Sequence, residues 1–160
     1  MWFFMNTCYL CSFLSFVMLL IAFAQSFVHF KVINADGLTF IVLTSIIYLF
    51  TETLVIFFFV GTGVSVKEYS IANKLDPIFH LKSIALKRRI YPPLMLNLLL
   101  MIILFITYGA VDTRHLPAWV YQIYFMICFI QYIDAKIIQH KCFRENTENV
   151  LAMSGLKLQG

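Results

Sequence analysis

Residues 38–64 read LTFIVLTSIIYLFTETLVIFFFVGTGV, and the only charged side chain in this stretch is Glu52. A run of about 18 or more apolar residues with few charges is typical of a transmembrane helix. Strands of a membrane barrel alternate in polarity, and this stretch does not alternate. The stretch therefore predicts a membrane-spanning helix that carries one acid in an apolar setting.

Three further apolar blocks surround this one, at about 8–30, 93–111 and 117–135. Each has about the length needed to cross a hydrocarbon core of about 30 Å. The whole chain of 160 residues is 61% hydrophobic and only 12% charged, whereas soluble domains are about 25% charged. We therefore expect an all-α polytopic membrane protein, with four transmembrane helices forming a bundle within residues 1–145.

The first block raises the question of a signal peptide. The sequence AFAQ at 22–25 offers a small-residue cleavage site after an apolar stretch. However, MWFFMNT at the start has no basic residue, and the apolar run continues through SFVHF. These features favour a retained helix, and cleavage of residues 1–24 stays open.

The distribution of basic residues predicts the orientation, because Lys and Arg gather in cytoplasmic loops. Ten of the twelve lie in the connection 65–92 or after the fourth block, and only Lys31 and Arg114 lie on the other side. Both termini and the connection 65–92 should therefore face the cytoplasm, in a bacterial inner membrane or its organellar equivalent.

The segments between and after the blocks also carry local predictions. We expect the connection 65–92 to form two helical pieces interrupted near Asp76–Pro77. Pro92 and Pro93 suit the start of the third helix, where a missing N–H has no cost. The polar tail 146–160 is expected to be disordered.

Lys87, Arg88 and Arg89 form a basic run just before the third block. Each basic residue near an anionic leaflet gains about 1 kcal/mol. The run predicts contact with anionic lipid headgroups and serves as a topology signal. Docking of a partner protein is the alternative.

Counting residues from the outer edge of each helix places several polar side chains at the depth of Glu52. At 1.5 Å per residue, Asn97 and Gln131 fall in the same layer, with Ser15 close to it. Polar groups in a membrane interior seek one another, so these four residues are predicted to form one polar intramembrane layer.

Three interpretations of Glu52 follow. In the favoured one it is protonated and donates to Asn97 or Gln131, because amides are available at its depth and no basic partner is apparent. In the second it faces a partner subunit, and in the third it is a proton or cation site. Asp134, the nearest other acid, lies close to the inner edge, where Lys136 could pair with it.

Histidine and cysteine offer weaker candidates. His29 and His115 lie at the outer ends of two helices and could hold a haem. His115 falls in a loop, however, and hydrogen bonding at the interface is the favoured interpretation. The four cysteines, including the Cys8–Cys11 pair, are expected to be small buried side chains rather than metal ligands or disulfides.

The sequence contains no separate soluble domain for a catalytic site, no nucleotide-binding motif and no internal repeat of the kind many transporters carry. The favoured function is therefore an accessory or structural subunit of a larger membrane complex, with lipid and other membrane proteins as partners, and without enzymatic activity or nucleic-acid binding. The alternatives are a small proton- or ion-coupled transporter that uses Glu52 and a haem-carrying redox protein that uses His29 and His115.

Overall fold

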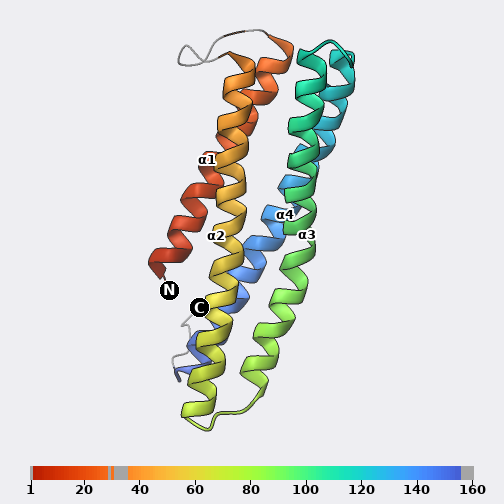
Figure 1. The fold of residues 1–160 in the computed structure, drawn as a ribbon. Coiled ribbons are helices and arrows are strands. Elements are labelled where there is room, and N and C mark those ends of the chain that lie inside the picture. Colours follow the sequence, from red (N-terminus) through yellow and green to blue (C-terminus); the bar gives the residue numbers. More distant parts are fainter. Residues whose placement is uncertain (1, 29, 31–35, 156–160) are drawn as a thin grey trace.

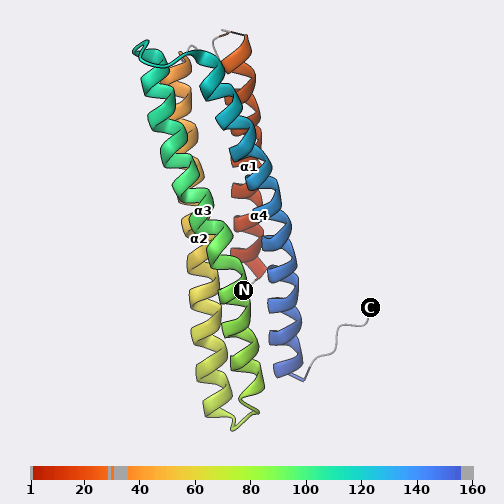
Figure 2. The same ribbon diagram turned by 90° about the vertical axis from the view of Figure 1, so that its right-hand side faces the viewer.

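The computed structural model describes residues 2–28, 30 and 36–155, and this part of the chain consists of four long helices (Figure 1). They are α1 (Trp2–Phe27), α2 (Gly37–Ala72), α3 (Ile78–Asp112) and α4 (Ala118–Met153). Consecutive helices run antiparallel and pack side by side in an elongated up-down-up-down bundle (Figure 2). The all-helical fold is therefore confirmed.

Three of the helices, α1, α2 and α3, are long and apolar enough to cross a membrane. The fourth helix, α4, does not reach the same apolarity, because charged residues begin at Asp134 and continue to its end. We call the end of the bundle with the connections 28–36 and 113–117 the upper end, and the end with the turn 73–77 the lower end (Figure 1).

The helices extend further towards the lower end than the apolar blocks predict. Helix α2 continues to Ala72 rather than ending near 64, and α4 continues to Met153 rather than ending near 135. The predicted disordered tail is thus wrong for residues 146–153. Buried side chains on one face, including Val66 on α2 and Phe143 and Thr147 on α4, hold these extensions together.

Helix α3 begins at Ile78, so Pro92 and Pro93 lie inside it rather than at its start. Proline removes the hydrogen bond to the carbonyl four residues earlier, which here belongs to Arg88 and Arg89. Both arginines are exposed, and a carbonyl at such a position can be satisfied by water. The predicted break near Asp76–Pro77 is confirmed, because α2 ends at Ala72 and α3 begins at Ile78.

Two apolar cores fill the bundle. The upper core is centred on buried side chains that include Met18, Ile41, Leu104 and Phe125. The lower core contains Cys8, Val55, Phe58, Phe59, Leu94 and Phe143, and its rings stack closely, with Phe59 and Phe143 centroids 5.3 Å apart. The candidate site lies between these two cores.

Helix α1 is shorter than the others at the lower end. It begins at Trp2, well above the lower tips of α2 and α3 (Figures 1 and 2). It packs closely against α2 but only sparsely against α4. Within the described residues, the lower part of the bundle is therefore built from three helices, and the seam between α1 and α4 is the loosest between neighbouring helices.

Candidate functional site

A layer of polar side chains separates the upper core from the lower core on all four helices. On α2, Glu52 lies between Tyr48 of the upper core and Val55 of the lower core. On α3, Asn97 lies between Met101 and Leu94 in the same way. Helix α1 contributes Ser12 and Ser15, and α4 contributes Lys136 and Gln139.

Glu52 forms an ion pair across the bundle. Its Oε1 lies 2.8 Å from Nζ of Lys136, and its side chain is fully buried, while that of Lys136 is 17% exposed. The two residues come from α2 and α4, which are diagonal to each other in the bundle. The pair therefore links two helices whose backbones are not adjacent, above the ring contacts of Phe58 and Phe59 with Phe143.

The ion pair corrects two expectations. The first concerns the partner of Glu52, which is Lys136 rather than the amide of Asn97 or Gln131. The second concerns Lys136, which pairs with Glu52 rather than with Asp134. Because Glu52 is fully buried within the bundle, it does not face a partner subunit either. Its second oxygen, Oε2, has no hydrogen-bond partner among the described residues.

Lys136 connects the ion pair to α1 through a short chain of hydrogen bonds. Its Nζ donates to Oε1 of Gln139 at 2.8 Å, and Nε2 of Gln139 donates to Oγ of Ser12 at 3.4 Å. Tyr132 donates from its hydroxyl to the backbone carbonyl of Ser12 at 2.9 Å, and its ring lies 5.1 Å from Nζ of Lys136. We call Ser12, Glu52, Tyr132, Lys136 and Gln139 the Glu52 network.

The other three residues predicted for this layer have different surroundings. Ser15 is fully buried and shares a hydrogen bond of 2.8 Å with Thr51, next to Glu52. Asn97 is buried beside a small cavity of about 10 Å³ that Tyr48 and Cys128 also line. Neither amide atom of Asn97 has a hydrogen-bond partner within the described part of the chain. Gln131 lies above Tyr132 along α4, outside the layer that Lys136 and Gln139 occupy.

Lys136 reaches the polar layer although its backbone lies below it, because a side chain need not lie level with its own Cα. Lys136 is five residues below Gln131, about 7.5 Å along α4. A helical side chain leans towards the N-terminus of its helix, which for α4 is the upper end. The long lysine side chain therefore reaches upward to Glu52.

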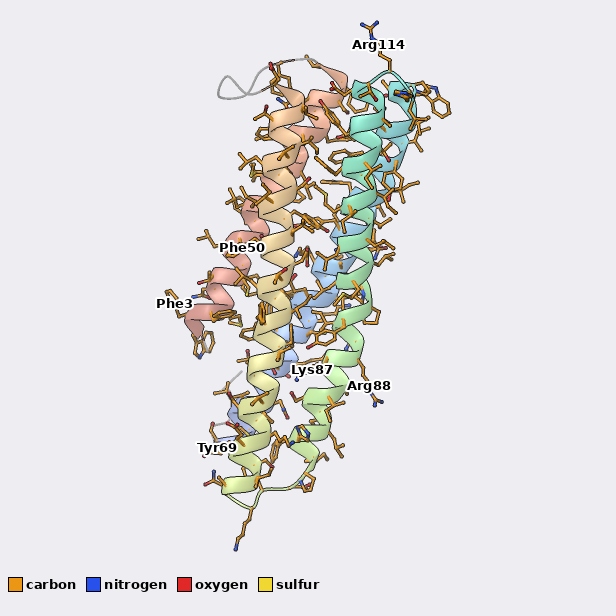
Figure 3. The ribbon with its side chains drawn as sticks, viewed as in Figure 1. Phe3, Phe50, Tyr69, Lys87, Arg88 and Arg114 are labelled. Atoms are coloured by element: carbon orange, nitrogen blue, oxygen red, sulfur yellow. The ribbon has the colours of Figure 1, made fainter. Side chains whose placement is uncertain are left out.

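The basic run before the third apolar block separates into three environments. Arg88 points away from the bundle, whereas Lys87 points into the space between α2 and α3 (Figure 3). There its ammonium covers Gly63, whose missing side chain leaves room for it. Arg89 forms an exposed ion pair with Glu145 on α4, with a distance of 2.9 Å between the charged atoms.

The described histidine and cysteine side chains are not arranged as the ligands of a metal ion. His29 lies outside the described residues, and Nδ1 of His115 is 2.9 Å from the hydroxyl of Thr113. Within residues 2–28, 30 and 36–155, no three His, Cys, Asp or Glu side chains gather as a metal site would require. All four cysteines are free thiols, with Cys8 and Cys142 buried.

An upper cavity of about 430 Å³ lies between the helix ends, lined by Gln25, Tyr108, Asp112, Arg114 and Tyr121 among others. Below it along the bundle come the fully buried Leu104 and Phe125 of the upper core. These apolar side chains lie between the cavity and Glu52. They therefore separate the ion pair from the upper cavity, as expected for an ion pair with a structural role.

Three lateral grooves open in the lower half of the described bundle, and two of them adjoin α1. One, of about 500 Å³, lies between α2 and α4 below the start of α1. The other, also of about 500 Å³, lies along the seam between α1 and α4, beside Lys136.

Comparison with known proteins finds no matching family model, no similar curated protein and no similar solved structure.

Proposed function

We propose that this chain is a multi-pass membrane protein, with all four helices crossing the bilayer and both termini on the lower side, and that it is an accessory subunit of a larger membrane assembly. Three helices have the length and apolarity to span. Helix α4 runs beside α3 and has no charged residue between Ala118 and Ile133. Ten of the twelve basic residues lie in segment 65–92 or after Ile133 in the sequence, and this distribution supports a cytoplasmic orientation of the lower end, in an inner membrane or its organellar equivalent.

The charges on α3 give the position of the bilayer in this proposal. Residues 90–111 contain no charged side chain, and these 22 residues span about 32 Å, close to the thickness of a hydrocarbon core. The lower boundary then lies just above Arg89. Gly63 on α2 lies beside Ser83 on α3, so six residues higher on each helix Phe57 is level with Arg89. Residues 58–72 then project about 22 Å beyond the hydrocarbon.

The observation that carries the accessory role is the groove between α2 and α4 in this projecting part. Its lining is largely apolar and includes Phe57, Phe58, Val66, Tyr69, Val150 and Met153. Apolar side chains that face lipid need no further explanation, but a contiguous apolar surface beyond the bilayer marks an interaction site. We refer to it as the α2–α4 groove.

The occupant that fits the α2–α4 groove best is a helix of a partner membrane protein. Phe4 near the start of α1 lines the groove, so the groove continues the place that α1 occupies higher in the bundle. Helices commonly dock in such grooves through side chains at positions i, i+3, i+4 and i+7.

Two glycines provide a matched test. Gly61 lines the α2–α4 groove, and a side chain added there would meet no atom within 4 Å. Gly109 on α3 has equally open surroundings and lies outside the groove. Leucine at either position should be compatible with folding, because leucine has the higher helix propensity. Gly61→Leu should fill the groove, whereas Gly109→Leu should leave it open.

The experiment is extraction of the tagged wild type and both variants from native membranes in mild detergent, with quantitative mass spectrometry of bound proteins. The proposal expects a stoichiometric membrane partner that Gly109→Leu retains and Gly61→Leu loses. It is contradicted if the wild type is extracted alone or only with copies of itself, or if both variants retain the same partner equally. Circular dichroism of both variants checks that the bundle is folded.

The Glu52 network supports a structural role over ion-coupled transport. The carboxylate already has Lys136 as a counter-ion, and the packed upper core separates it from the upper cavity. A transport pathway usually needs several titratable groups that face a water-filled space. This geometry fits a structural role, in which the ion pair fixes the position of α2 along the bundle axis relative to α4.

A further inference from the structure

The seam between α1 and α4 contains a groove with an apolar wall and a basic lower end. Phe13 and Phe16 on α1 and Ile133 and Ile137 on α4 line its sides. Three of these side chains are substantially exposed, Phe13 at 66%, Ile133 at 41% and Ile137 at 49%. We refer to it as the α1–α4 groove, and it has the shape needed for a long apolar chain lying between two helices.

Three basic side chains line the lower part of the α1–α4 groove, namely Lys136, His140 and Lys141. Lys136 has three N–H donors, of which Glu52 and Gln139 use two. Its ammonium therefore keeps one donor for a ligand. No acidic residue is found among the described residues that line the groove. Glu52 offsets the charge of Lys136, so Lys141 gives the groove its net positive charge.

His140 is held in place at this end. Its Nδ1 is 2.9 Å from the hydroxyl of Tyr9 on α1, and the two rings lie 5.9 Å apart. Because Nδ1 is engaged by the tyrosine, Nε2 is the atom that remains for an outside partner. Lys141 follows His140 and is exposed, so its ammonium is free to move towards an anion.

The height of the α1–α4 groove matches one leaflet of the bilayer. Ile133 is 15 residues below Ala118, about 22 Å along α4, and Lys141 is 23 residues below it, about 34 Å. With the bilayer placed as proposed above, the apolar walls lie in the lower half of the hydrocarbon. The basic end lies where headgroups begin, about 30 Å from the upper surface.

We propose that the α1–α4 groove binds one anionic glycerophospholipid of the lower leaflet. Its phosphate would contact Lys141, Nε2 of His140 and the remaining donor of Lys136, and one acyl chain would lie along Phe13, Phe16 and Ile133. Basic pockets between transmembrane helices on the cytoplasmic side are suited to such headgroups. The inference rests on the proposed membrane placement and is independent of the accessory role.

The first test is native mass spectrometry of the purified full chain in detergent, with dioleoyl phosphatidylglycerol or dioleoyl phosphatidylcholine added. The acyl chains of the two lipids are identical, so a difference in occupancy reports the headgroup. The wild type should bind one phosphatidylglycerol in preference to phosphatidylcholine. Lys141→Gln should weaken this binding about fivefold, the equivalent of about 1 kcal/mol for one basic residue.

Arg114→Gln is the matched control, since it removes the same charge at the opposite end of the bundle, where Arg114 projects outward (Figure 3). It should bind phosphatidylglycerol as the wild type does. A second pair tests the acyl-chain site. Ile133→Trp should obstruct the groove and reduce binding of the lipid, whereas Ile127→Trp changes an exposed side chain of α4 outside the groove and should not.

Equal occupancy by the two lipids, or equal loss in Lys141→Gln and Arg114→Gln, would overturn the proposal. So would saturation of the site by inorganic phosphate alone, because the acyl chain would then contribute nothing. Partner capture in the Gly61 experiment does not depend on this groove. If the wild type shows no preference for phosphatidylglycerol while partner capture is intact, this inference is refuted and the proposed function stands.

Discussion

The Glu52–Lys136 ion pair makes a sharp prediction about stability, because its two members are buried to different extents. Glu52 is fully buried, whereas the side chain of Lys136 is 17% exposed beside the α1–α4 groove. Lys136→Met leaves a carboxylate with no route to solvent, and should cost about 3–5 kcal/mol of the free energy of unfolding. Glu52→Met leaves a lysine that can turn into the groove, and should cost less, about 1–3 kcal/mol.

The double variant separates the interaction from the individual losses. Replacing both members of a buried pair by apolar residues of similar volume is often close to neutral. We therefore expect Glu52→Met/Lys136→Met to cost about 0–2 kcal/mol, well below the sum of the single variants. The coupling energy of the cycle, the difference between the summed single losses and the double loss, should be about 5 kcal/mol.

The measurement is unfolding of the purified protein in dodecyl maltoside micelles by added sodium dodecyl sulfate, followed by far-ultraviolet circular dichroism. Ile127→Met, at a side chain that is 53% exposed, serves as the control and should have little effect. If the losses of the two single variants sum to the loss of the double variant within about 0.5 kcal/mol, the ion pair does not stabilise the bundle and its structural role is refuted. A larger loss for Glu52→Met than for Lys136→Met would refute the asymmetry derived from burial.

Two further predictions concern the cores, with the same unfolding assay. Phe143→Ala removes a fully buried ring that packs against Phe58 and Phe59 and should cost about 3–5 kcal/mol. Phe50→Ala, at a side chain that is 59% exposed (Figure 3), should cost far less, and equal losses would contradict the packing. Asn97→Leu removes a buried amide without a partner among the described residues and should stabilise the bundle by about 1 kcal/mol. A loss of stability instead would show that the amide is hydrogen-bonded.

The sequence alone determined the class of fold and much of the polar layer. Long blocks with few charges can only be helices if they lie in lipid, and the break near Asp76–Pro77 follows from proline and a short polar segment. The layer was partly predictable because position along a helix scales with residue number. Glu52, Asn97 and Ser15 all lie between the two cores for this reason.

Only the tertiary structure decided what Glu52 contacts and where the helices end. The partner on α4 depends on how far Lys136 reaches and on which way its side chain leans, and a count of backbone positions contains neither quantity. The helical residues 146–153 are held by packing against α1 and α3, as Thr147 does at Met5 and Asn149 at Phe79, and a polar sequence gives no sign of it. Both grooves adjoin α1, which packs closely against α2 and loosely against α4, and this relation between distant segments is fixed only when the chain folds.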